Sequence, residues 1–266
     1  MTIVPPTCLT VCHHRRSNTP PESEDVWTWL CAAAACRGDR LAVVEVETET
    51  LLNYHQLHAH AVHAAAYLAH RGVHSGARLG VLAANSAAVM VAHFAAAATR
   101  AVVVNCNTQL AVAELSYVLQ NAQVEVLLAE ASLADVVGDF PNVIWIGDPL
   151  WAEIIAGRAL REPDAMHQLL DAVRAAASPD DQYQLYHTSG TTGKPKAVVL
   201  THAMVAMHAI AAADHMHLDA SDVWCHAAPM YHLVDAFAIY AVTLVGGRHV
   251  TVSAFAASEL PLVLGA

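Results

Sequence analysis

Residues 186–202 read Tyr-His-Thr-Ser-Gly-Thr-Thr-Gly-Lys-Pro-Lys-Ala-Val-Val-Leu-Thr-His. Gly190 and Gly193 allow a backbone that turns its N–H groups toward one point, and such a nest binds anions. Hydroxyl and ammonium side chains accompany the glycines: Thr188, Ser189, Thr191, Thr192, Lys194 and Lys196. The stretch therefore predicts a cradle for a polyphosphate. From composition alone, the alternative is a surface loop rich in small residues.

A Walker A loop is excluded by the spacing. That motif has four residues between its first glycine and the Gly-Lys pair, with Ser or Thr directly after the lysine. Here two residues intervene, and Pro195 follows Lys194. The Ala-Val-Val-Leu run that comes next is typical of a strand, so we expect no helix N-terminus at the phosphates.

The distribution of basic residues also indicates that this stretch binds phosphate. Of thirteen basic residues in the chain, eleven are arginines and two are lysines, Lys194 and Lys196. Lysine approaches phosphate oxygens as a compact point charge. Two clustered lysines in a chain that otherwise uses arginine therefore favour phosphate binding here.

Strand and helix patterns alternate on both sides of this stretch. Asn53, with Gln56 three residues on, predicts a capped helix that ends at Gly72. Strands are expected at 41–46, 78–82, 101–104, 124–128, 143–146, 183–186, 197–200, 223–225 and 249–252, and further helices at 27–36, 86–98, 111–119, 203–213 and 234–244. Such alternation is typical of an α/β fold with mainly parallel sheet layers flanked by helices.

A charged, proline-containing stretch that ends at 178–181 is the best place for a domain boundary. We expect residues 1–23 to be a disordered or targeting-like segment. Residues 24–178 would form a first α/β subdomain. Residues 179–266 would be the truncated start of a second subdomain that carries the phosphate loop.

Charge and hydropathy argue against a nucleic-acid partner and against a transmembrane segment. A formal net charge of -11 argues against a nucleic-acid footprint, which needs a basic stripe. The uncharged run at 79–99 contains Asn85, Ser86 and His93, so we expect no transmembrane segment. The sequence is compatible with peripheral membrane contact. It is also compatible with a location in the cytoplasm, peroxisome, plastid or mitochondrion.

The stretch at 186–202 resembles the phosphate-loop signature of the adenylate-forming superfamily, which includes acyl-CoA synthetases, luciferases and adenylation domains of peptide synthetases. One departure is Ala197, where that family usually has glycine; a methyl group costs little with extended torsions and much at positive φ. Further similar segments lie at 52–57, 76–86, 114–115 and 229–232 (Pro-Met-Tyr-His). The likeness covers roughly residues 24–255 and implies the first part of the family's large N-terminal domain.

The resemblance implies an AMP-forming acid–thiol ligase, an acyl-CoA synthetase that acts on a fatty or related organic acid. A carboxylate would attack the α-phosphorus of ATP to give acyl-AMP and pyrophosphate, and a thiol would then displace AMP. ATP, Mg²⁺ and coenzyme A are the implied cofactors.

The same resemblance assigns the site. The implied nucleotide-binding residues are Thr188, Ser189, Gly190, Thr191, Thr192, Gly193, Lys194 and Lys196. His232 would lie near the reacting carboxylate, and it joins Lys194 as a catalytic candidate. Thr192 is the candidate ligand of Mg²⁺. For His232 the alternative is a half-buried histidine with satisfied hydrogen bonds.

Later segments of the family have no match in this chain. A Tyr-Gly-x-Thr-Glu segment, a ribose-binding aspartate and a C-terminal lysine are missing, and no lysine follows Lys196. We therefore expect a truncated chain that does not complete acyl-CoA synthesis alone. One alternative is a catalytically dead nucleotide-binding or regulatory paralogue. Another is an unrelated phosphate-binding enzyme such as a kinase, which would release ADP.

Overall fold

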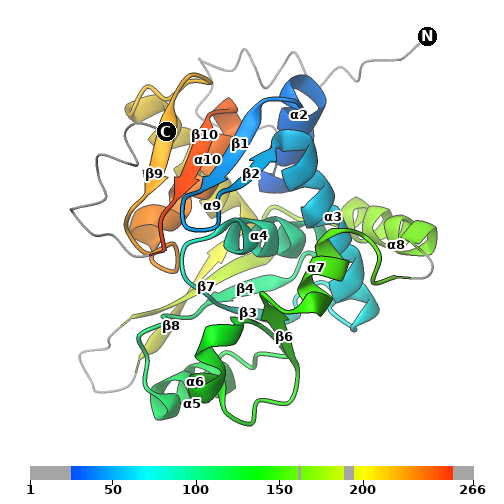
Figure 1. The fold of residues 1–266 in the computed structure, drawn as a ribbon, viewed down its shortest axis with the longest axis vertical. Helices are drawn as coiled ribbons and strands as arrows, with labels where there is room; N and C mark the ends of the chain where they lie inside the picture. Colours follow the sequence, from blue (N-terminus) through cyan, green and yellow to red (C-terminus); the bar gives the residue numbers. More distant parts are fainter. Residues whose placement is uncertain (1–24, 161–162, 189–194, 254–266) are drawn as a thin grey trace.

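Two β-sheets lie one above the other, and helices fill the layer between them (Figure 1). The computed structural model describes residues 25–160, 163–188 and 195–253. Within these ranges the strands form one four-stranded and one six-stranded sheet. This arrangement confirms the expected α/β fold with helices against mainly parallel sheets.

The six-stranded sheet has the order β6-β5-β3-β4-β7-β8. Its strands are β3 (Arg78–Leu82), β4 (Val102–Asn105), β5 (Val126–Glu130), β6 (Val143–Ile146), β7 (Gln182–Thr188) and β8 (Lys196–Thr201). Neighbouring strands are parallel except β7 and β8, which form an antiparallel hairpin. The central strands β3 and β4 are almost entirely buried, because helices cover both faces of the sheet.

The four-stranded sheet joins the two ends of the described chain. Its order is β2-β1-β10-β9, and its strands are β1 (Leu41–Glu45), β2 (Thr50–Asn53), β9 (Val223–His226) and β10 (Arg248–Thr251). The strand β1 is parallel to β10, so that Val43 lies opposite His249, and β2 folds back antiparallel on β1. Each sheet thus contains strands from before and after residue 178, and the expected subdomain boundary there stays a prediction.

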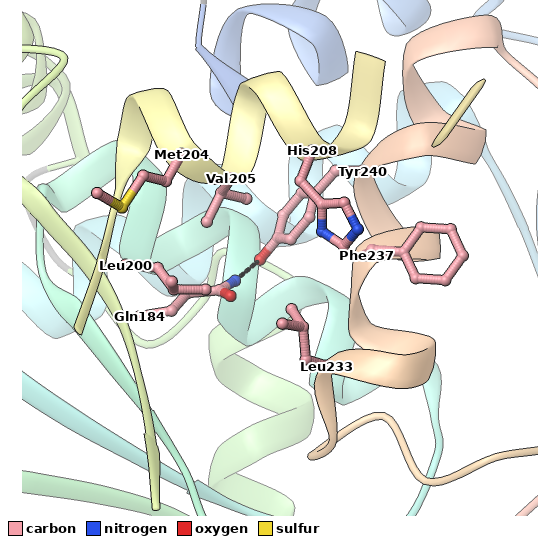
Figure 2. A pocket seen from close by; sticks show the side chains of 8 residues that line it. All are labelled: Gln184, Leu200, Met204, Val205, His208, Leu233, Phe237 and Tyr240. Carbon is pink, nitrogen blue, oxygen red and sulfur yellow. Dashed lines mark hydrogen bonds between the residues drawn. The ribbon is translucent and has the colours of Figure 1, made fainter. Parts of the chain in front are cut away.

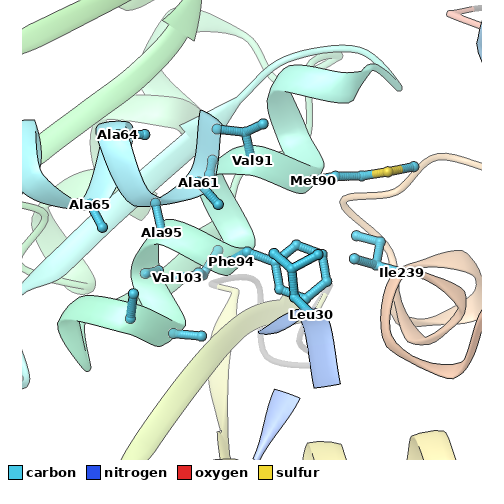
Figure 3. Close-up of a cluster of buried hydrophobic side chains, with 14 of the residues drawn as sticks. Leu30, Ala61, Ala64, Ala65, Met90, Val91, Phe94, Ala95, Val103 and Ile239 are labelled. Atoms are coloured by element: carbon cyan, nitrogen blue, oxygen red, sulfur yellow. The ribbon is translucent and has the colours of Figure 1, made fainter. Parts of the chain in front are cut away.

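The helices between the sheets are rich in alanine. They are α2 (Val26–Arg37), α3 (Tyr54–His70), α4 (Ala87–Thr99), α9 (His202–His215) and α10 (Leu233–Val245). Every residue of α4 except Ala88 is buried, as expected for a helix that is apolar on all sides. Figure 3 shows how small side chains of α3, such as Ala61 and Ala65, let it approach Val91 and Ala95 of α4.

Further helices lie on the outer surfaces. They are α5 (Val112–Asn121), η1 (Ala131–Leu133, a 3-10 helix), α6 (Ala134–Val137), α7 (Pro149–Ile155) and α8 (Pro163–Ala175). Leu115 and Leu119 of α5 pack with Leu127 in a second apolar cluster, on the face of the six-stranded sheet away from α4. Both α7 and α8 contact α3.

The expected helix and strand bounds lie within two residues of those observed. The capping box at the start of α3 is confirmed, because Gln56 N donates to Asn53 Oδ1 at 2.8 Å and Asn53 N donates to Gln56 Oε1 at 2.8 Å. The strand β2 and the helix α6 were not expected. Both are four residues long, too short to show a clear periodicity.

A buried arginine ties three segments together. Arg100 caps the C-terminus of α4 with φ at +57°, and its side chain is only 2% exposed. The guanidinium donates to Asp25 Oδ2 at 3.1 Å, to Asp181 Oδ2 at 2.7 Å, and to the carbonyl of Ser178. Asp25 caps α2 and Asp181 directly precedes β7, so this one side chain fixes their positions relative to α4.

His93 and His202 are buried without a direct contact to a carboxylate. Burial lowers the pKa of His93, in α4, to about 4. His202 begins α9, and its ring stacks on Tyr183 at 4.3 Å. Burial, and then the nearby charge of Arg100, lower the pKa of His202 to about 3. Both side chains are therefore neutral in the folded protein at pH 7.

The arginine contacts predict a large effect of Arg100→Ala on stability. The substitution leaves two carboxylates, 22% and 35% exposed, without their buried partner, and loss of hydrogen bonds to charged groups costs about 1.5 to 3 kcal/mol. Urea unfolding followed by far-ultraviolet circular dichroism measures the change. Arg158→Ala is the control, since Arg158 pairs with Glu153 at the exposed surface. A midpoint equally unchanged in both variants would contradict the role given to Arg100.

The buried histidines predict a loss of stability in mild acid. Their folded-state pKa values lie below the ordinary value near 6.5, so the unfolded chain binds protons first as the pH falls. Stability is complete above about pH 6.5 and falls below it, by about 2 kcal/mol per histidine at pH 5. Unfolding midpoints at pH 7.5 and pH 5.0 test this. In His202→Phe the pH dependence should be smaller, whereas an equal dependence would exclude His202 as a source.

Candidate active site

The predicted phosphate loop connects the two strands of the β7–β8 hairpin. Thr188 ends β7 and lies opposite Lys196, the first residue of β8, with the Thr188 hydroxyl donating to the Lys196 carbonyl at 3.5 Å. Both residues are exposed. The remaining predicted ligands lie outside the described residues: Ser189, Gly190, Thr191, Thr192, Gly193 and Lys194. The strand β8, rather than a helix, follows the loop, as expected.

The departure at Ala197 is accommodated by the hairpin. Ala197 lies in β8 opposite His187, and it is not among the residues with positive φ. A β-carbon is compatible with extended torsions. The alanine therefore introduces no backbone strain at the end of the loop.

The Pro229–His232 segment leads from β9 into α10. His232 N donates to the Pro229 carbonyl at 3.0 Å, which closes a turn, and His232 is the N-cap of α10. The imidazole is exposed and packs edge-on against Tyr231 at 4.7 Å. His232 is thus presented at the surface rather than held as a half-buried core histidine.

Asn85 holds this segment from the opposite sheet. It follows β3 and is buried, and its Nδ2 donates to the carbonyls of His226 at 2.7 Å and Ala228 at 2.8 Å. The Met230 amide donates back to Asn85 Oδ1 at 2.7 Å. One side chain therefore fixes the backbone just before His232.

A buried polar cluster, which the sequence did not reveal, closes the base of the segment. His226 Nδ1 lies 2.6 Å from Asp235 Oδ2, and His226 Nε2 lies 3.0 Å from His249 Nδ1. The indole of Trp224 donates to Asp235 Oδ1 at 3.1 Å, and Thr243 contacts His249. Burial, and then His226, lower the pKa of His249 well below its ordinary value. Because His226 ends β9 and Asp235 lies in the first turn of α10, their contact fixes both ends of the connection.

A cavity of about 280 Å³ lies beside this segment, between the hairpin and two helices (Figure 2). Gln184 and Leu200 contribute from β7 and β8, and Met204, Val205 and His208 from α9. The lining is mainly apolar, which suits a hydrocarbon group.

Residues of one face of α10 complete the cavity: Leu233, Phe237 and Tyr240. Leu233 directly follows His232 in the chain, so the cavity begins one residue after it. At its other end the Tyr240 hydroxyl accepts from Gln184 Nε2 at 2.5 Å (Figure 2). The sequence could not show this cavity, since its walls come from segments about fifty residues apart.

Layered sheets, a glycine- and hydroxyl-rich hairpin loop and a clamped Pro-Met-Tyr-His segment define an adenylate-forming enzyme domain. Residues 30–264 match the AMP-binding enzyme family, and the chain belongs to that family.

Relatives of the chain are CoA ligases. A long-chain-fatty-acid–CoA ligase of Mycobacterium tuberculosis is 32% identical over 214 residues, which are 77% of this chain and 41% of the relative. A 2-succinylbenzoate–CoA ligase of Bacillus licheniformis is 27% identical over 241 residues, or 87% and 46% of the two chains. The chain thus spans less than half the length of these relatives.

The fold is similar to that of a solved N-terminal domain. The N-terminal domain of FACL13 from Mycobacterium tuberculosis superposes with a TM-score of 0.78 at 26% identity, over 91% of this chain and 60% of that domain. Within the described residues, every helix is too short or too polar to cross a bilayer.

The Asn85 contacts predict that Asn85→Ala loosens the segment before His232. Loss of the side chain leaves the Met230 amide and two carbonyls without their partner, so the Met230 amide should exchange at least about tenfold faster. Hydrogen exchange of peptides that cover 226–232 measures this. Asn142→Ala is the matched control, because Asn142 also bonds a backbone carbonyl, that of Glu125, far from this segment. Unchanged protection in Asn85→Ala would show that other contacts hold the segment.

Proposed function

We propose that this chain forms the phosphate-binding and acyl-binding parts of an AMP-forming acid–thiol ligase for a fatty or related organic acid. The proposal rests chiefly on one observation: the strands of the phosphate-loop hairpin line the same apolar cavity as Leu233, the residue directly after His232. Family membership and the CoA-ligase relatives support the same reaction type.

The hairpin loop would hold the phosphates of ATP. Its donor set suits them, because hydroxyls, glycine N–H groups and the ammonium groups of Lys194 and Lys196 are all anion-binding groups. Thr192 is the residue we propose for Mg²⁺, which prefers oxygen ligands and commonly bridges protein and phosphate oxygens. The bound ion would neutralise part of the phosphate charge.

The reaction would proceed in two displacements. A carboxylate oxygen of the acid attacks the α-phosphorus of ATP, the bond to the bridging oxygen breaks, and pyrophosphate leaves. The sulfur of coenzyme A then attacks the acyl carbon, and AMP leaves. Lys194 would stabilise the developing phosphate charge, and His232 would orient the carboxylate. Such catalysis depends mainly on positioning and electrostatics.

The cavity would hold the tail of the acid. It begins beside His232 at Leu233 and continues along α10. A carboxylate at His232 would therefore place its hydrocarbon tail among apolar side chains, away from the charged loop. Burial of that tail favours binding by about 0.8 kcal/mol per methylene.

The double variant Thr191→Ala/Lys194→Ala tests the loop, in the full polypeptide that contains this chain. It should abolish ATP binding measured by calorimetry and the acid-dependent exchange of pyrophosphate into ATP, because a hydroxyl and a charge are removed from the cradle. Arg158→Ala removes one exposed charge elsewhere and serves as the control. Unchanged ATP affinity in the double variant would refute the loop assignment.

The products formed from ATP distinguish the proposed ligase from a kinase and from an inactive paralogue. AMP and pyrophosphate are expected from the ligase, whereas a kinase would release ADP. ATP binding without any acid-dependent exchange would instead indicate a catalytically dead paralogue.

A further inference from the structure

The cavity has one open end and one closed end. Met204 and Leu233 are 54% and 40% exposed and His208 is also exposed, which places the opening along α9 and the first turns of α10. Gln184 and Tyr240, on the other side, are each 1% exposed. A ligand that enters beside His232 would therefore meet Gln184 and Tyr240 last (Figure 2).

The closed end is held by a network of buried hydrogen bonds. The Tyr240 hydroxyl lies within 2.6 Å of His93 Nδ1 and 3.0 Å of the Tyr183 hydroxyl, besides its bond from Gln184. The Tyr186 hydroxyl donates to Gln184 Oε1 at 2.9 Å. A longer ligand could displace Gln184 or Tyr240 only by leaving buried polar groups without partners, which is unfavourable. This end of the cavity is therefore a fixed stop.

The helix gives the length of the cavity. Leu233, Phe237 and Tyr240 lie at positions i, i+4 and i+7 of α10, on one face. Seven residues of α-helix rise about 10 Å. A zigzag hydrocarbon chain with carbon–carbon bonds of about 1.5 Å covers that distance in roughly eight carbons.

The volume of the cavity gives a similar size for the ligand. A cavity of about 280 Å³ is nearly twice the roughly 150 Å³ that accommodates one benzene ring. In proportion, it accommodates roughly eleven carbons. Length and volume together place the fitting tail at about eight to eleven carbons, below the length of long-chain fatty acids.

We infer that this ligase is selective for carboxylic acids with an apolar tail of medium length, and that Gln184 and Tyr240 set the upper limit. The inference rests on the proposed function, because it takes the cavity as the acyl site. Straight-chain and arylalkanoic acids whose tails have about eight to eleven carbons fit it. Hexadecanoate does not fit, since overfilling a packed cavity is unfavourable.

A chain-length series on the unmodified full polypeptide tests this. Butyrate, hexanoate, octanoate, decanoate, dodecanoate and hexadecanoate are compared for binding by calorimetry without ATP, and for kcat/KM in pyrophosphate exchange. Affinity should rise to octanoate or decanoate and fall at least about tenfold at hexadecanoate. Equal or tighter binding of hexadecanoate would overturn the inference.

Variants at the closed end of the cavity test whether Gln184 sets the limit on chain length. Gln184→Ala removes the amide at the closed end and should shift the optimum toward dodecanoate. Tyr186→Phe is the matched control, because it removes a hydrogen bond to Gln184 without adding space to the cavity. A shift in Tyr186→Phe equal to that in Gln184→Ala would contradict a steric stop. If Gln184→Ala does not fold, the series on the unmodified protein still decides the length limit.

The two readouts separate this inference from the proposed reaction. A length limit in binding without any pyrophosphate exchange supports the cavity assignment and refutes the reaction. Exchange that is equally efficient with octanoate and hexadecanoate supports the reaction and refutes the length limit.

Discussion

The contacts of Arg100 set the position of the phosphate-loop hairpin. Its guanidinium binds Asp181, whose backbone carbonyl accepts from His202 N at 3.0 Å. One turn at 178–181 therefore anchors both the start of β7 and the start of α9, the helix that follows β8. Because Arg100 itself ends the fully buried helix α4, the base of the hairpin is fixed to the centre of the molecule.

Much of the fold could be predicted because local sequence and tertiary packing agree. The capping box at Asn53 and Gln56 starts α3 in the structure as the sequence indicated. The apolar run at 86–98 is helical and buried on all sides, so alanine propensity and burial favour the same state. The short strands between such helices could be predicted because strand and helix patterns alternate along the chain. The phosphate loop was predicted from its glycines, hydroxyls and lysines as well as by resemblance to a family, and the Pro-Met-Tyr-His segment by that resemblance alone. The structure places both on connections that follow strands.

The remaining features depend on contacts between distant residues. No local pattern shows that β10 pairs with β1 across about two hundred residues, or that the strands on either side of residue 178 mix in both sheets. His226 and His249 looked like ordinary members of a histidine-rich chain. In the structure, Asp235 of another element supplies a partner to His226, and His226 and Thr243 supply partners to His249. The same is true of the cavity, whose closed end needs Gln184 from a strand and Tyr240 from a helix.

The two sheets meet where their strands end, and this accounts for the location of the site. In parallel sheets, ligands bind outside the carboxyl ends of the strands. Asn85 follows the carboxyl end of β3, and the segment it holds follows the carboxyl end of β9 in the other sheet. Glu45, at the end of β1, accepts from the first amide of α4, so an acidic side chain of the upper sheet also caps the connection after β3. These contacts orient both sets of strand ends toward one region. Thr188 ends β7 in the same sheet as β3, so the phosphate loop begins at the corresponding edge. In the proposed reaction, the phosphate loop and the segment before His232 thus come from separate sheets without a long loop to bring them together.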